Sequence, residues 1–156
     1  MISPLSLSRI LLPTDLSEHN LVGFHYALRL ALAARSRLAM VHVSRHRHGV
    51  GWEDFPSLRA THERWGGVVP GASKSDVVAL GIEVDKRLKE HDDPVTVVLD
   101  YLRQHPAELL VLVTEQRKRS SWPGESRAEL LDVERSVRRF FFLRGLLDSL
   151  RQKRAR

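Results

Sequence analysis

Short apolar runs alternate along this chain with segments in which apolar residues recur at helical spacing. The first run, about Arg9 to Leu12, predicts a strand that Pro13 closes, and Ser17 is a good N-cap for the helix that follows. The apolar face of that helix consists of Leu21, Phe24, Leu28 and Ala31. Arg35-Ser36-Arg37 breaks this pattern, and Leu38 to Val43 predicts a second strand. Together these segments predict a βαβ unit.

The segment from Arg45 to Gly71 is rich in glycine and proline, which favours loop structure. We expect a short helix within it, from about Pro56 to Arg64. Trp52 and Trp65 are expected to cover apolar surface and so to fold this insert onto the rest of the domain. The stretch from Ser73 to Leu80 predicts a second short helix.

Further along, Ile82 to Leu88 predicts a third strand, and Asp93-Pro94 is a strong helix start because the aspartate can cap and the proline suits the first helical position. Leu109 to Val113 is a continuous apolar run, typical of a strand buried on both faces. The alternation predicts an α/β fold, an open parallel sheet of four to five strands with flanking helices in Rossmann-like layers.

After Val113 the pattern supports two interpretations. Residues 130–141 fit a helix, but Phe140 to Leu143 also fits a short final strand. The charge divides the chain in the same region. Residues 1–116 carry 13 basic and 14 acidic side chains, whereas residues 117–156 carry 12 basic and 5 acidic ones. We therefore expect an α/β body over 1–116 and a basic, mainly helical C-terminal segment of the same domain over 117–156.

The composition sets limits on the function. The chain has 156 residues, a length that suits one domain, and no cysteine, which excludes disulfides and thiolate metal sites. It shows no secretion signal and no apolar run long enough to cross a membrane, so we expect a cytoplasmic protein without membrane contact. The basic segment could bind nucleic acid or another polyanion weakly and in a salt-sensitive way, but a solvated helix surface is its more common meaning.

The chain resembles the universal stress protein family. The matching segments are Arg9-Ile-Leu-Leu-Pro-Thr-Asp-Leu-Ser-Glu18, the helix and strand that continue to Val43, the helix start at Asp93-Pro94, and Ala107-Glu-Leu-Leu-Val-Leu-Val-Thr114. The resemblance implies a five-stranded parallel α/β fold, usually a homodimer, in a stress-response protein. Some members of the family bind ATP or AMP and others do not.

For a nucleotide, the resemblance implies a site at the carboxyl ends of the strands. Asp15 would lie beside adenine, and the backbone of Val41, His42 and Val43 would line the base pocket. Pro13, Thr14 and Thr114 complete the residues that the resemblance places at the ligand.

The family holds phosphates with a loop after the fourth strand, patterned Gly-x-x-Gly, nine residues, then Gly-Ser or Gly-Thr. Glycines serve there because backbone N–H groups can approach phosphate without a Cβ in the way. Here Gln116 and Arg119 occupy the first two glycine positions, and the third falls near Glu129. Gly124 comes too early and is followed by glutamate. We therefore predict that tight ATP binding is lost.

Two other groups of residues suggest chemistry only weakly. His42, His46 and His48 could bind a metal, but the arginines between them disfavour a cation, and we expect no metal site. Asp15 with His19 could suggest acid–base catalysis, but a carboxylate at a helix start more often caps the helix. We expect no catalytic residues.

Three functions remain open from the sequence. The first is a degenerate universal stress protein-like module that meets an unknown protein partner and has no nucleotide cofactor. The second is an ATP- or AMP-binding module with Asp15 at the base. The third is a weak polyanion or nucleic-acid binder that acts through the basic segment. The missing glycines favour the first.

Overall fold

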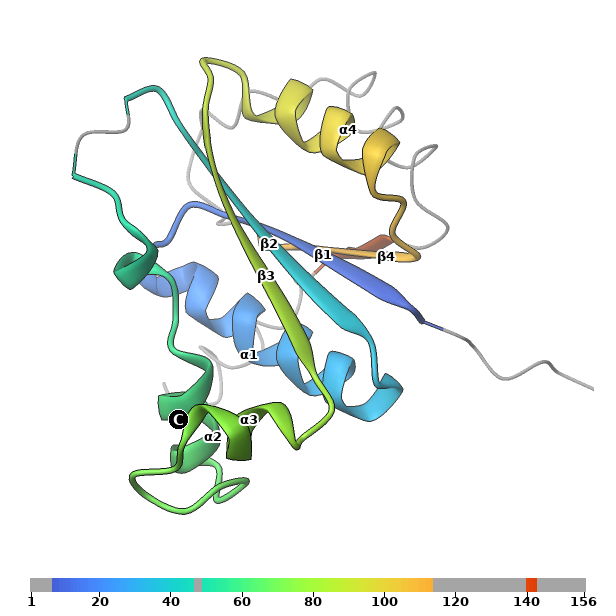
Figure 1. The fold of residues 1–156 in the computed structure, drawn as a ribbon. Coiled ribbons are helices and arrows are strands. Elements are labelled where there is room, and N and C mark those ends of the chain that lie inside the picture. The colour runs from blue at the N-terminus through green and yellow to red at the C-terminus, as the bar shows by residue number, and fades with distance from the viewer. Residues whose placement is uncertain (1–6, 47–48, 114–139, 143–156) are drawn as a thin grey trace, which may run out of the picture.

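The computed structural model describes residues 7–46, 49–113 and 140–142, which form a five-stranded parallel sheet between helices (Figure 1). The strand order is β3-β2-β1-β4-β5, with every pairing parallel. The strands are β1 (Arg9–Thr14), β2 (Arg37–Ser44), β3 (Glu83–Glu90), β4 (Leu109–Leu112) and β5 (Phe140–Phe142). The predicted fold class is confirmed.

The helices fall on both faces of the sheet. They are α1 (Glu18–Ala34), α2 (Leu58–Arg64), α3 (Lys74–Val78) and α4 (Pro94–Gln104), with a 3₁₀ turn, η1, at Trp52–Asp54. Figure 1 shows α1 on the face that α2 and α3 also share, and α4 on the opposite face. Two helix starts agree with the sequence: the Ser17 hydroxyl accepts from the Asn20 N–H, and the Asp93 carboxylate accepts from the Val95 N–H.

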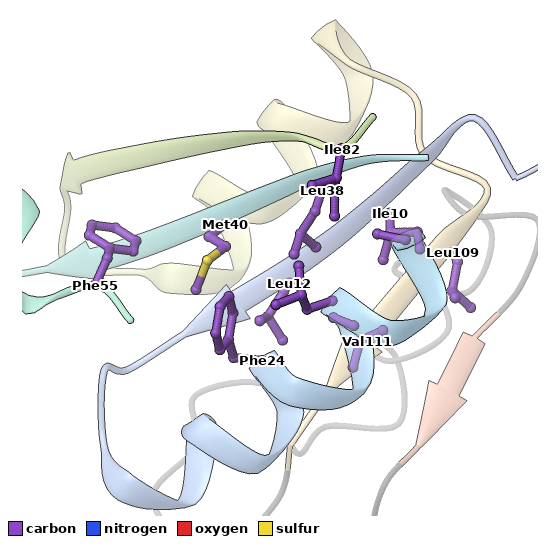
Figure 2. Close-up of a cluster of buried hydrophobic side chains, with 12 residues drawn as sticks. Ile10, Leu12, Phe24, Leu38, Met40, Phe55, Ile82, Leu109 and Val111 are labelled. Atoms are coloured by element: carbon purple, nitrogen blue, oxygen red, sulfur yellow. The ribbon is translucent and has the colours of Figure 1, made fainter. Parts of the chain in front are cut away.

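Each face of the sheet has its own apolar cluster, because successive strand residues point to opposite sides. On the α1 face, shown in Figure 2, side chains from β1 and β2 pack against the helix. The members labelled there are Ile10, Leu12, Phe24, Leu38, Met40, Phe55, Ile82, Leu109 and Val111. On the α4 face Leu11, Ala39 and Leu110 pack against Val98 and Leu102.

Two sequence expectations need correction here. β1 continues through Pro13 to Thr14, although proline was expected to close it. The β1–β4 pairing includes only Ile10 and Leu11, so Pro13 lies beyond it and its missing N–H costs little. Leu21 is 37% exposed and lies outside the buried face of α1.

The structure distinguishes the two interpretations of the segment around Phe140, a helix or a short final strand. Phe140–Phe142 is a strand that pairs with Leu110–Leu112 of β4, so the strand interpretation is confirmed at these positions and the helical one is wrong there. The helix expected elsewhere over 117–156 lies outside the described residues. The division of the chain near residue 116 stays a prediction.

The insert docks on α1 through aromatic rings. Trp65 packs against the α1-face cluster as expected, with the Arg29 guanidinium 4.7 Å from its ring centroid and the His25 ring 5.4 Å away. Trp52, in contrast, is 56% exposed, although it stacks on Phe55 at 6.1 Å. Trp65 therefore covers apolar surface as expected, whereas Trp52 covers little of it.

We expect the buried His62 to make this docking sensitive to acid. Its ring is 2% exposed, and its Nε2 has no hydrogen-bond partner within the described part of the chain. Burial lowers the pKa of His62 below the ordinary 6.5, and burial together with Arg64 and Arg29 lowers the pKa of His25. The folded state thus favours the neutral rings, while the unfolded chain takes up protons near pH 6.5.

We therefore expect the free energy of unfolding to be highest above about pH 6.5 and to fall as the pH drops below that value. Urea unfolding at pH 7.5 and 5.5 measures the difference. His62→Gln, which cannot be protonated, should show a smaller difference between the two pH values. An equal pH dependence in the variant and the wild-type protein would contradict this role of His62.

Candidate functional site

The strand order reverses between β1 and β4. The chain runs from β1 to β2 and β3 on one side, then crosses over to β4 and β5 on the other. In open parallel α/β sheets the connections diverge at such a point, and ligands bind there. β1 ends at Thr14 and β4 at Leu112, so Asp15 lies in the loop that leaves this edge.

The loop between β1 and α1 is held by side-chain hydrogen bonds. The Thr14 hydroxyl accepts from the Leu16 N–H at 3.0 Å, and Asp15 Oδ1 accepts from the Ser17 N–H at 2.9 Å. Leu16 has a φ of 62°, a left-handed conformation that non-glycine residues seldom adopt. These contacts give the carboxylate a fixed place before the first turn of α1.

Asp15 is exposed, and its carboxylate accepts a second hydrogen bond, from a side chain of α1. The Asn20 side-chain amide donates to its Oδ1 at 2.5 Å. Partial burial alone would raise the pKa of Asp15, but the hydrogen bonds from Ser17 and Asn20 together outweigh this effect and lower the pKa. The carboxylate is therefore ionised at neutral pH. Both of these donors, the Ser17 N–H and the Asn20 amide, meet Oδ1, and the residue as a whole is exposed.

The end of β2 lies beside the end of β1. Pro13 pairs in register with Val41 and Thr14 with His42. His42 is buried, and its Nδ1 lies 2.8 Å from the Thr14 carbonyl oxygen. Because a carbonyl only accepts, Nδ1 carries the proton in this bond. Val41 is buried and Val43 half-buried. The structure thus brings the five predicted residues of β1 and β2 to one edge of the sheet, and Asp15 follows β1 directly.

Thr114 and the residues compared with the phosphate loop, Gln116 and Arg119, lie outside the described residues. The same holds for His48 of the histidine cluster. Among residues 7–46, 49–113 and 140–142, no group of three His, Asp or Glu side chains is placed to hold a metal ion. His42 already bonds to the Thr14 carbonyl.

Sequence reasoning missed two α1 residues that shape this edge. Asn20 is 9% exposed, and its Oδ1 is buried without a hydrogen-bond partner among the described residues. Gly23 allows α1 to approach the end of β4 closely, since a Cβ there would overlap Val113 Cγ2. The only sequence signal for the role of Asn20 was its spacing from Asp15 and Ser17. Nothing in the sequence indicated the role of Gly23, because it depends on a contact between α1 and the distant end of β4.

The comparisons with known proteins agree with this fold. A family model described as "Universal stress protein family" matches residues 7–122. A solved universal stress protein in complex with cAMP is similar at 15% identity, with a TM-score of 0.54, covering 89% of this chain and 98% of its own.

Two further solved structures are similar. A universal stress protein family member from Burkholderia pseudomallei has 22% identity and a TM-score of 0.52, covering 90% of this chain and 98% of its own. A universal stress protein from Archaeoglobus fulgidus has 16% identity and a TM-score of 0.50, covering 86% and 97%. No curated protein matches the sequence. No helix in the described ranges is long and apolar enough to cross a membrane.

Proposed function

Because the chain belongs to the universal stress protein family, we propose that it is a small binding module of the stress response that does not hold ATP tightly. The module keeps the base-facing half of the family's nucleotide site and has lost the phosphate-holding half. The observation that carries this proposal is the replacement of two loop glycines by Gln116 and Arg119.

The retained half fits an adenine edge. Asp15 is ionised, is positioned by Ser17 and Asn20, and is exposed, so its carboxylate can accept a further hydrogen bond. The exocyclic amine of adenine is a donor that such an acceptor can meet. The backbone at Val41–Val43 lies at the same sheet edge. The neighbour solved with cAMP shares this fold, so an adenine nucleotide is the first ligand to test.

The phosphate half is weakened for a physical reason. A Cβ at positions 116 and 119 keeps backbone N–H groups from approaching phosphate oxygens as closely as glycines allow. Each lost hydrogen bond to a charged group costs about 1.5–3 kcal/mol, so the loss of two lowers affinity roughly 10²- to 10⁴-fold. Arg117, Lys118 and Arg119 can still attract an anion, but through screened charge.

A homodimer is part of the same proposal. β5 forms one edge of the sheet beyond β4, and no further strand covers it within the described residues. An open strand edge can pair with the same edge of a second copy. The surface of such a module, alone or as a dimer, is what would meet a protein partner.

Any adenine binding that remains should depend on Asp15. We expect Asp15→Ala to abolish AMP binding, because it removes the acceptor for the base, and to leave the circular dichroism spectrum unchanged. Calorimetric titration with AMP and with adenosine measures both affinities. The two ligands should bind alike, because the phosphate adds little.

Glu18→Gln is the matched control, since Glu18 is an exposed carboxylate three positions further along the same segment. It should bind AMP as the wild-type protein does. Equal AMP affinity in wild-type protein and Asp15→Ala would show that the base lies elsewhere.

A further inference from the structure

A polar cavity of ≈ 510 Å³, wide open to solvent, lies at the amino ends of the strands, the edge of the sheet opposite to Asp15. It is lined by the residues that lead into β1, β2, β3 and β4. The charged members are Arg9, Arg35, Arg37 and Glu83. A volume of this size lies within the range of small-molecule pockets, and the lining shows which chemistry it would accept.

The cavity has an excess of positive charge. Its lining holds three arginines and one glutamate, and Arg37 already pairs with that glutamate, Glu83, at 2.7 Å. Neither Arg9 nor Arg35 has a carboxylate partner for its side chain among the described residues. The Arg9 guanidinium donates to the Pro106 carbonyl, at 3.4 Å. Glu108 lies close in the fold, but its carboxylate accepts from the backbone N–H of Ser8 and Arg9 and from the Ser8 hydroxyl.

This arrangement is unfavourable for the folded chain alone. Arg9 and Arg37 are direct neighbours in the β1–β2 register, and like charges opposite each other in a sheet repel. Arg35 ends α1 with a φ of 52°, the left-handed conformation for which glycine is strongly preferred. A strained position occupied by a charged side chain is a reason to look for a ligand there.

We propose that this cavity binds a small phosphate-type anion, with Arg9, Arg35 and Arg37 as its ligands. Guanidinium groups match phosphate oxygens with paired N–H donors, and a dianion would offset both the repulsion of the arginines and the strain at Arg35. The volume leaves room for an organic group beyond the phosphate itself, as in a phosphate ester. The site lies at the other edge of the sheet from Asp15 and is independent of the nucleotide proposal.

Arg35→Gly separates binding from folding, because glycine removes the charge and relieves the left-handed strain together. We expect this variant to bind inorganic phosphate and pyrophosphate about tenfold more weakly, the effect of one lost charge-assisted hydrogen bond, while its melting temperature rises. Arg9→Gln should weaken binding similarly, and Glu83→Gln should strengthen it. Arg59→Gln on α2 is the control and should bind as the wild-type protein does.

The full chain should be titrated by amide-resolved NMR, so that the responding residues are seen. Phosphate should shift the signals of residues 8–9 and 35–37, in Asp15→Ala as well as in the wild-type protein. Unchanged phosphate affinity in Arg35→Gly, or shifts confined to residues 117–156, would overturn the proposal.

Discussion

Replacing Phe24 by alanine should lower the free energy of unfolding by about 3–5 kcal/mol. Phe24 is 1% exposed and lies between α1 and the sheet, within the α1-face cluster (Figure 2). The variant loses the free energy gained by transferring the ring from water to the core. It also leaves a cavity that the rigid strands cannot close. Urea unfolding of wild-type and variant protein measures the difference. Against a total stability of about 5–15 kcal/mol, the loss would bring the fold close to its limit.

Leu21→Ala is the matched control, one turn earlier on the same helix. Leu21 is 37% exposed and belongs to neither apolar cluster, so its truncation should change the stability by no more than about 0.5 kcal/mol. Similar losses in the two variants would contradict the placement of α1 on the sheet.

Cutting the chain after Gln116 should abolish cooperative unfolding or cause aggregation. The cut removes β5, which pairs with Leu110–Leu112 of β4. β4 is buried along its whole length, so an apolar strand would become an exposed sheet edge. A chain ending at Leu143 keeps β5 and should unfold cooperatively. Circular dichroism during urea unfolding, together with light scattering, compares the two.

A fragment 1–116 that unfolds cooperatively at the wild-type midpoint would contradict this role of β5. The outcome also bears on the basic segment, since a test of polyanion binding by truncation would confuse lost charge with lost folding. Neutralising arginines one by one in the full chain avoids that problem.

Local signals predicted most of the fold. Ser17 and Asp93-Pro94 mark helix starts because their side chains or ring satisfy the first turn, and both helices begin there. The apolar run from Leu109 predicted a buried strand because residues on both of its faces must leave water, and Leu109–Leu112 is such a strand. The parallel sheet followed from the alternation of these elements.

The errors arose where tertiary contacts decide. β3 was expected to end at Leu88, but it continues to Glu90 because an edge strand can keep charged side chains in solvent. Thr14 stays in β1 because it pairs with His42 across the sheet. Neither pairing can be read from one segment of the sequence.

The candidate site was predicted in part. The position of Asp15 after an apolar strand was sufficient to place it at the carboxyl edge of the sheet, where the structure has it. The donor from Asn20 and the bond from His42 to the Thr14 carbonyl depend on side-chain directions that only the fold defines. The arginine cavity was missed for a similar reason, since it joins residues from the starts of four different strands.

A calorimetric titration of the full chain with ATP tests the central claim most directly. With Gln116 and Arg119 in place of the loop glycines, we expect a dissociation constant well above about 1 µM, which means a binding free energy weaker than about −8 kcal/mol. A dissociation constant near or below that value would show that the phosphate-holding half of the site is intact, and would contradict the account.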